Sequence, residues 1–191
     1  MRWLIALIVL AVGTISPASA QASDLFAQMR DDRGLVVLMR HAIAPGGGDP
    51  AGFTLGDCST QRQLSAQGRS QARAIGKQFR SQDIPIAGVR SSRWCRAVDT
   101  ATLLGLGKVR TSSALDSVFT ASDQVVNRKK WQTEKIIRDH RDKSGVLILV
   151  GHQANIIDLT GIAPDSGGAV VVKADASGRI RVIGQLAPPD F

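Results

Sequence analysis

The sequence predicts an α/β domain, a three-layer sandwich in which helices flank a mostly parallel central sheet. Two apolar runs, residues 35–39 and 146–150, are continuous rather than alternating, as in strands that are buried on both faces of a parallel sheet. Segments with helical spacing of apolar residues lie between such runs, so strands and helices alternate along the chain. With 191 residues, 43% of them hydrophobic, the chain is long enough for one such domain.

The expected elements follow from apolar periodicity, helix caps and glycine-rich breaks. The central strand ends at Arg40-His41, and the glycine-rich segment that follows it continues neither a strand nor a helix. Ser65 is the expected N-cap of a helix that ends near Arg80. The other expected elements are a helix over 23–32, a strand over 84–92, a helix over 93–104, a strand over 109–114, an amphipathic helix over 125–141, a strand over 146–150, a helical turn over 155–159, and a hairpin of 169–173 with 179–183.

The first twenty residues have the pattern of a secretory signal peptide. Met1-Arg2 gives a positive start, residues 3–12 are almost wholly apolar, and Ala18-Ser19-Ala20 fits the small-x-small cleavage rule. The apolar stretch is short for a membrane span. We therefore expect residues 1–20 to be removed and residues 21–191 to form an exported domain, periplasmic or secreted, without a stable membrane anchor. A retained anchor and a buried helix are the alternatives.

The charge of the chain favours anionic partners. Without Arg2 it has 23 basic and 16 acidic residues, a formal charge of +7. Phosphorylated small molecules, lipopolysaccharide, anionic lipids and nucleic acid all fit this charge. Nucleic acid fits least, because only 4% of the residues are aromatic, Tyr is absent, and no nucleic-acid-binding motif is present.

The two cysteines, Cys58 and Cys95, suit an oxidising compartment. Each lies close to a segment that we place at the candidate site, so we expect them to form a disulfide. In the chain-entropy description, such a bridge would stabilise the fold by about 3–4 kcal/mol. Two reduced, buried thiols are the alternative.

Polar side chains follow three predicted strands at the point where each strand ends. These are Arg40-His41, then Arg90-Ser91-Ser92 with Arg96 shortly after, and Gly151-His152. Because the carboxyl ends of parallel strands meet at one edge of a sheet, we expect these groups to lie together. Guanidiniums hold phosphate oxygens in pairs, and a neutral imidazole can attack phosphorus. The pattern predicts a site for a phosphate dianion.

Four motifs, in this order, resemble the histidine phosphatase superfamily, the clan of the phosphoglycerate mutases and acid phosphatases. Leu38-Met39-Arg40-His41 resembles the Arg-His motif, with Ala42 where the family usually has Gly. Residues 64–72 resemble Leu-Thr-x-x-Gly-x-x-Gln-Ala, and residues 91–101 resemble Ser-Ser-Pro-x-x-Arg-Ala-x-x-Thr-Ala. Val150-Gly151-His152 resembles the second histidine motif. The resemblance implies a phosphoglycerate mutase-like fold and phosphatase activity.

The resemblance also implies a role for each matched residue. His41 would be the nucleophile that is transiently phosphorylated, and Arg40, Arg96 and His152 would hold the phosphoryl oxygens. No metal or other cofactor is required in this family, because fixed cations stabilise the developing charge. Water would then attack the phosphohistidine. Ser92 is expected to contribute to substrate binding.

The sequence departs from the family at the general acid. Members that cleave alkyl phosphates usually have a Glu two residues after a Leu, whereas Leu115 is followed by Asp116 and Ser117. Asp116 is the first candidate for the acid, with Asp123 and Asp49 behind it. A helix or turn cap is the alternative role of Asp116. Without an acid, substrates with good leaving groups would be favoured.

Two polar segments, 46–50 and 57–62, resemble an exported bacterial subgroup that includes lipopolysaccharide core heptose phosphatase. We expect them to form a substrate loop over the phosphate site, with Arg62 as an extra cation. A surface turn is the alternative. The expected partner is a phosphorylated small molecule or a lipopolysaccharide core sugar phosphate.

Other chemistries fit the sequence less well. A zinc hydrolase is disfavoured because no His-x-x-x-His or Cys-x-x-Cys pair occurs, and a serine hydrolase because no Gly-x-Ser-x-Gly occurs. His140, Arg93 and the run Arg128-Lys129-Lys130 are expected at the solvated surface. The main hypothesis is a metal-independent phosphomonoesterase that acts through His41. The alternative is a degenerate family member that binds phosphorylated ligands or envelope glycolipid without turnover.

Overall fold

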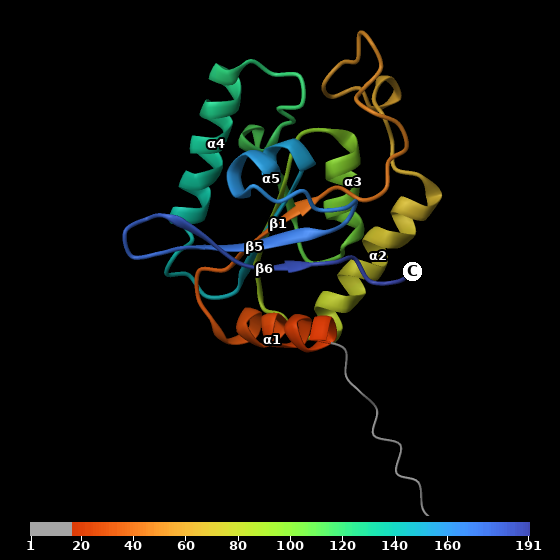
Figure 1. Ribbon diagram of the computed structural model, residues 1–191. Coiled ribbons are helices and arrows are strands. Elements are labelled where there is room, and N and C mark those ends of the chain that lie inside the picture. Colours follow the sequence, from red (N-terminus) through yellow and green to blue (C-terminus); the bar gives the residue numbers. More distant parts are fainter. Residues whose placement is uncertain (1–16) are drawn as a thin grey trace, which may run out of the picture.

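The structure is a computed structural model that describes residues 17–191 (Figure 1). Residues 1–16, most of the expected signal peptide, lie outside the described residues. The first described helix, α1 (Pro17–Asp31), begins before the helix expected over 23–32 and includes Ala20, after which cleavage is expected. Within the described part of the chain, no helix combines the length and the apolar character needed to cross a membrane. Signal cleavage and export stay predictions.

A six-stranded mixed sheet with the order β3-β2-β4-β1-β5-β6 forms the centre of the fold. Its strands are β1 (Val36–Arg40), β2 (Ile86–Ser91), β3 (Val109–Thr111), β4 (Val146–Gly151), β5 (Ala169–Ala174) and β6 (Ile180–Leu186). The pairs β3-β2, β2-β4 and β4-β1 are parallel, whereas β5 pairs antiparallel with both β1 and β6. The predicted mostly parallel sheet and its terminal hairpin are confirmed, because only β5 among the described strands runs against the rest.

Helices cover both faces of this sheet and make the predicted three layers (Figure 1). Besides α1 they are α2 (Ala66–Ser81), α3 (Cys95–Leu103), α4 (Asp123–Arg138) and α5 (Gln153–Thr160), with two 3-10 turns, η1 (Cys58–Thr60) and η2 (Ser113–Leu115). Val37 and Met39 of β1 pack with α1, α2 and α3, whereas Val36 and Leu38 pack with α4 and α5. Alternate side chains of β1 therefore enter opposite layers, which is why its apolar run is continuous.

Two expectations about polar residues outside the site are wrong. The side chain of His140 is 3% exposed, and its Nε2 donates to the carbonyl oxygen of Gly145 at 2.9 Å. The turn between α4 and β4 covers the His140 ring, although the residues next to His140 in the sequence are charged. Lys129 does not lie on a fully solvated helix face, because its Nζ donates to the Ser113 carbonyl oxygen and its side chain is 14% exposed.

The start of α2 packs closely against the segment that follows His41. Ser65 caps the helix as predicted, because its Oγ accepts from the Gly68 N–H at 2.9 Å. Its backbone N–H also donates to the Ile43 carbonyl oxygen at 3.0 Å. A Cβ on Gly68 would lie 2.0 Å from that same Ile43 oxygen. Glycine at this position therefore allows the helix to contact the backbone next to the candidate nucleophile.

We expect Gly68→Ala to lower the free energy of unfolding by about 1–3 kcal/mol, because the added methyl group forces the helix and the Ile43 backbone apart. In an open helix the same substitution would stabilise the chain. Urea unfolding of the variant measures the loss. Gly47→Ala is the matched control, since a Cβ there meets nothing within 4 Å. Equal stability of Gly68→Ala and the unsubstituted chain would contradict the packing argument.

Candidate active site

The carboxyl ends of β1, β2 and β4 bring His41, Ser92 and His152 to one edge of the sheet. The backbone N–H of His41 donates to Gly151 at 3.0 Å, and that of Ser92 donates to Val150 at 2.8 Å. The ring centroids of His41 and His152 are 5.5 Å apart, with an interplanar angle of 69°. The structure thus assembles polar groups from three separate strand ends around two imidazoles.

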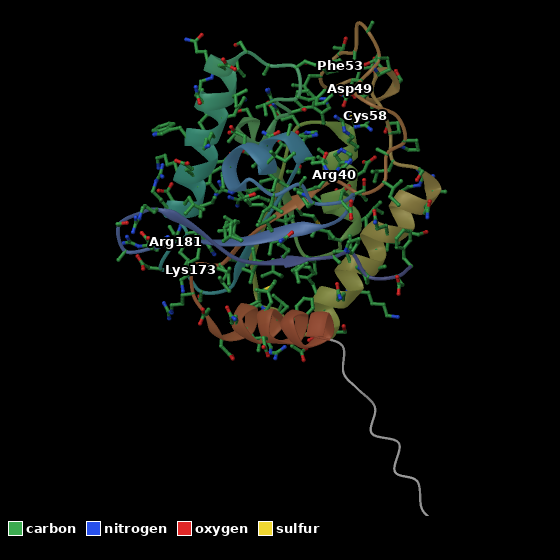
Figure 2. All side chains as sticks on the ribbon, viewed as in Figure 1. Arg40, Asp49, Phe53, Cys58, Lys173 and Arg181 are labelled. Atoms are coloured by element: carbon green, nitrogen blue, oxygen red, sulfur yellow. A yellow bond between two sulfur atoms is a disulfide. The ribbon has the colours of Figure 1, made fainter. Side chains whose placement is uncertain are left out.

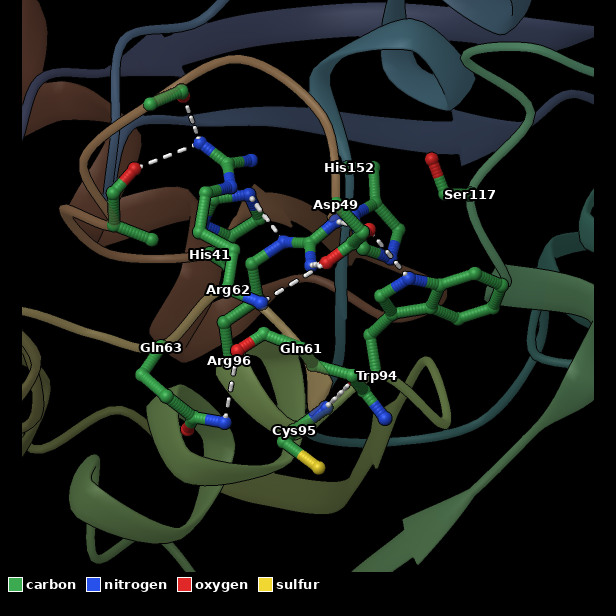
Figure 3. Close-up of polar contacts among 12 residues, drawn as sticks. His41, Asp49, Gln61, Arg62, Gln63, Trp94, Cys95, Arg96, Ser117 and His152 are labelled. Atoms are coloured by element: carbon green, nitrogen blue, oxygen red, sulfur yellow. Dashed lines mark hydrogen bonds and ion pairs between the residues drawn. The ribbon is translucent and has the colours of Figure 1, made fainter. Parts of the chain in front are cut away.

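His41 is buried and held with Nε2 toward a guanidinium. Its Nδ1 lies 2.8 Å from the Ala42 carbonyl oxygen, which can only accept, so Nδ1 carries the proton. Nε2 therefore keeps its lone pair, and Arg96 Nε donates to it at 3.2 Å (Figure 3). Burial lowers the pKa of His41 to about 3, and the charges of Arg96, Arg62 and Arg40 act in the same direction. The imidazole is thus neutral at physiological pH, as a nucleophile must be.

Arg96 extends from the first turn of α3, and its side chain is 3% exposed. While its Nε faces His41, its Nη1 and Nη2 donate to the two carboxylate oxygens of Asp49 at 2.7 and 3.1 Å (Figure 3). Asp49 also accepts from Trp94 Nε1 at 2.9 Å and from the Arg62 backbone N–H at 3.2 Å. From the sequence, Asp49 is only a lesser general-acid candidate, and no motif singles out Trp94. The structure places both at the centre of the site.

Arg40 and Arg62 add two more cations near the first imidazole. Arg40 Nη1 donates to the Pro164 carbonyl oxygen at 3.2 Å, and Arg62 Nη1 donates to the carbonyl oxygens of Ala44 (2.7 Å) and Gly46. Burial lowers the pKa of both guanidiniums. Among the described residues, Arg40 Nε and Arg62 Nε are buried donors without a protein partner. Such orphaned donors are what an anionic ligand would satisfy.

His152 is the N-cap residue of α5 and is 4% exposed. Its Nε2 lies 2.8 Å from Ser92 Oγ, which also accepts from the Trp94 N–H at 3.2 Å. Burial lowers the pKa of His152 well below its ordinary value, and the charge of Arg96 adds to this shift. The ring is therefore neutral. Because the Ser92 hydroxyl contacts His152, it fixes the orientation of that ring in this arrangement.

Asp116 contacts cations. Its buried carboxylate accepts from Arg93 through the backbone N–H (3.2 Å), Nε (3.0 Å) and Nη2 (2.5 Å), and Lys129 Nζ lies 3.6 Å away. The contact with the Arg93 backbone N–H is not a helix cap, because Trp94 is the N-cap residue of α3 and has no side-chain cap bond. Arg93 stands where the family usually has Pro, so two departures from the family pattern are partners in one ion pair. A role of Asp116 as general acid stays a prediction.

The segment that carries Asp49 is fastened to the start of α3. The predicted disulfide is present, with 1.98 Å between the sulfur atoms of Cys58 and Cys95, and Cys95 directly precedes Arg96. Gln61, which is buried, accepts from the Cys95 N–H at 3.0 Å. Figure 2 shows Phe53, Asp49 and Cys58 together at the end of the molecule that lies away from α1. Phe53 packs on Trp94 with ring centroids 5.7 Å apart.

Comparison with protein families matches residues 36–118 to the histidine phosphatase superfamily (branch 1). The matched range begins with β1 and includes His41 and Arg96, while His152 lies beyond it. No curated protein sequence matches the chain.

Several solved structures share the fold. The protein histidine phosphatase SixA, solved with tungstate, is 18% identical with a TM-score of 0.59, over 81% of this chain and 97% of that one. Phosphoserine phosphatase from Entamoeba histolytica, solved with 3-phosphoglyceric acid, is 13% identical with a TM-score of 0.61, over 80% and 96%. Mycobacterial glucosyl-3-phosphoglycerate phosphatase is 16% identical with a TM-score of 0.59, over 81% and 99%. Residues 36–118 are therefore similar to the histidine phosphatase superfamily, and the chain shares the fold of these solved structures.

Proposed function

We propose that the chain is a metal-independent phosphomonoester hydrolase that works through a phosphohistidine at His41. The observation that carries the proposal is the neutral, buried imidazole of His41, whose unprotonated Nε2 faces Arg96 at 3.2 Å. Arg40 and Arg62 place two further positive charges near it. These fixed cations can stabilise the charge that develops on a phosphoryl group in transfer.

The first displacement forms a bond between His41 Nε2 and phosphorus while the ester P–O bond breaks. The leaving oxygen departs with the electron pair of that bond and takes up a proton. Arg40, Arg96 and His152 hold the phosphoryl oxygens, and the Nδ1–H bond to Ala42 keeps the ring aligned. In the second displacement water attacks phosphorus, the P–N bond breaks, and phosphate and neutral His41 are released.

We expect aryl phosphates to be hydrolysed faster than alkyl phosphates, by a ratio in kcat/KM on the order of 10². Asp116, the first candidate for the general acid, is paired with Arg93 and Lys129, so we expect it not to protonate an alkoxide leaving group. Phosphate release from p-nitrophenyl phosphate and from glycerol phosphate, with EDTA present, measures both the ratio and the independence from metal. Loss of turnover in EDTA would overturn the metal-independent mechanism. Equal rates would instead reveal a functional acid, which Asp116→Asn and Asp123→Asn would then locate.

The proposal includes export and a substrate of the cell envelope, with a lipopolysaccharide core sugar phosphate as the specific candidate. The signal-like residues 1–20, the formal charge of +7 that remains without them, and the disulfide between Cys58 and Cys95 support it. Structural neighbours were solved with phosphoserine and with 3-phosphoglyceric acid, which are phosphorylated small molecules. Turnover of core heptose phosphate, phosphoserine and a phosphohistidine peptide, compared side by side, tests the substrate. Fractionation of cells that express the full chain tests its location.

A second candidate function is the binding of phosphorylated ligands without turnover. The ion pairs of Asp116 with Arg93 and Lys129 favour this function, because they engage the first candidate for the general acid. Two results together would support this function: inorganic phosphate stabilises the protein against heat, and the protein releases no phosphate from any ester. Turnover of the aryl phosphate that depends on His41 would exclude it.

A further inference from the structure

The Asp49 carboxylate accepts hydrogen bonds from Arg96, the side chain expected to bind the oxygens of a phosphoryl group. Its side chain is 8% exposed, and each oxygen accepts two hydrogen bonds (Figure 3). Oδ1 accepts from Arg96 Nη1 at 2.7 Å and from the Arg62 N–H at 3.2 Å. Oδ2 accepts from Arg96 Nη2 at 3.1 Å and from Trp94 Nε1 at 2.9 Å. This carboxylate is thus bound as a ligand would be, by a charged fork and two neutral N–H groups.

Asp49 and His41 contact two sides of the same guanidinium. Arg96 Nε donates to His41, so its remaining fork, Nη1 and Nη2, is the part that can hold the oxygens of a group under attack by Nε2. The fork cannot hold Asp49 and a substrate in the same way at once. A phosphorylated substrate must therefore displace the Asp49 carboxylate before His41 can reach phosphorus.

The charge balance of this exchange depends on the incoming group. Asp49 is ionised, because the hydrogen bonds from Arg96 and Arg62 outweigh the effect of its burial and keep its pKa below the ordinary value. A monoanion that replaces it gains no charge interaction with the arginines. A dianion gains the attraction of one additional negative charge to Arg40, Arg62 and Arg96, which are only partly exposed to screening solvent.

We propose that Asp49 is a specificity-determining residue, a carboxylate seated in the phosphoryl site that dianionic groups displace and monoanionic groups do not. The inference rests on the proposed function only in taking a phosphate monoester as the substrate. Under it, phosphodiesters, sulfate esters and carboxylates, each with a single charge, are excluded from contact with His41.

The segment around Asp49 is anchored on both sides and contains glycines in the left-handed region. Gly48 and Gly52 flank it with φ values of +79° and +78°, and a Cβ on Gly52 would meet nothing within 4 Å. On one side the segment is held at Gly46, whose carbonyl oxygen accepts from Arg62 Nη1. On the other side it is held at Thr54, whose N–H donates to Thr60 Oγ1 at 2.9 Å. Displacement of Asp49 therefore involves the segment between residues 46 and 54, whose Phe53 packs on Trp94.

Binding of two inert ligands of equal shape tests the proposal without any turnover. Benzylphosphonate carries two charges at sufficiently alkaline pH, whereas benzylsulfonate carries one. Calorimetric titration is made on the unsubstituted chain, on Asp49→Asn, and on Asp142→Asn, an equal charge change at a side chain that is 82% exposed. We expect the unsubstituted chain and Asp142→Asn to bind the phosphonate and to reject the sulfonate. Asp49→Asn should bind both, with a phosphonate-to-sulfonate affinity ratio at least about tenfold smaller.

Three results would overturn the proposal. An unchanged ratio in Asp49→Asn would show that the carboxylate does not discriminate by charge. Weaker binding of both ligands to Asp49→Asn than to the unsubstituted chain would show that Asp49 positions Arg96 and does not compete with the ligand for it. Failure of the unsubstituted chain and of Asp49→Asn to bind the phosphonate would show that the cations do not form an anion site. By contrast, the expected binding pattern without phosphate release from aryl phosphates would reject the hydrolase and leave this inference standing.

Discussion

His41→Ala is expected to reduce kcat for aryl phosphate hydrolysis by at least about 10³-fold, since removal of a covalent nucleophile leaves only binding and electrostatic contributions. The structure supplies no second candidate among the described histidines. His152 Nε2 contacts Ser92 at 2.8 Å, and the His140 ring lies near Gly145 in the turn between α4 and β4. Intact mass spectrometry of the enzyme during turnover should show one added phosphoryl group in the unsubstituted chain and none in the variant.

The control for His41→Ala must separate lost chemistry from lost folding. His140→Gln removes another buried histidine that lies outside the site, so it should keep kcat at temperatures where it is folded. His41→Ala should still bind benzylphosphonate, because Arg40, Arg62 and Arg96 remain. Turnover of His41→Ala within tenfold of the unsubstituted chain would contradict the phosphohistidine mechanism. An added phosphoryl group on a peptide that contains His152 would reassign the nucleophile.

The sheet and the two histidine motifs could be predicted because their signals are local. The run from Leu35 to Met39 is continuous because alternate side chains enter opposite layers, and the polar residues after it mark the open edge of the sheet. β3 was predicted too long, over 109–114, because Ser113 to Leu115 form a 3-10 turn where an extended backbone was expected. The carboxyl end of a short edge strand has no such periodic signal.

Asp49 and His140, whose surroundings the sequence does not predict, owe those surroundings to distant packing. Asp49 stands 47 positions before Arg96, and nothing periodic connects a glycine-rich loop to the first turn of a helix. The available signal was an acidic residue, Asp49, eight positions after His41, in a chain whose other predicted site residues are mostly cationic. His140 has charged neighbours in the sequence, but the way α4 meets β4 decides its burial. In both cases long-range packing outweighs local composition.

Acid should destabilise the folded chain well before its carboxylates are protonated. The pKa of His41 falls from about 6.5 in the unfolded chain to about 3 in the fold, mainly through burial, and burial also lowers the pKa of His140 and His152. Between these two pKa values the unfolded chain binds more protons than the fold. The contribution of the neutral His41 to the free energy of unfolding is therefore complete above pH 6.5 and declines as the pH falls toward 3. In this window His41 contributes a loss of about 1.4 kcal/mol per pH unit, and the lowered pKa values of His140 and His152 act in the same direction.

The contribution of His41 can be isolated by comparing two slopes. We expect the free energy of unfolding, measured by urea titration at pH 8, 7, 6 and 5, to fall less steeply with acid in His41→Asn, by about 1.4 kcal/mol per pH unit below pH 6. Asp49 does not obscure this window, because its lowered pKa confines its effect to more acidic solutions. Equal slopes in the two proteins would mean that His41 is protonated in the fold near its ordinary pKa. A protonated imidazole has no lone pair at Nε2, so nucleophilic attack would then be lost as the pH falls below about 6.5.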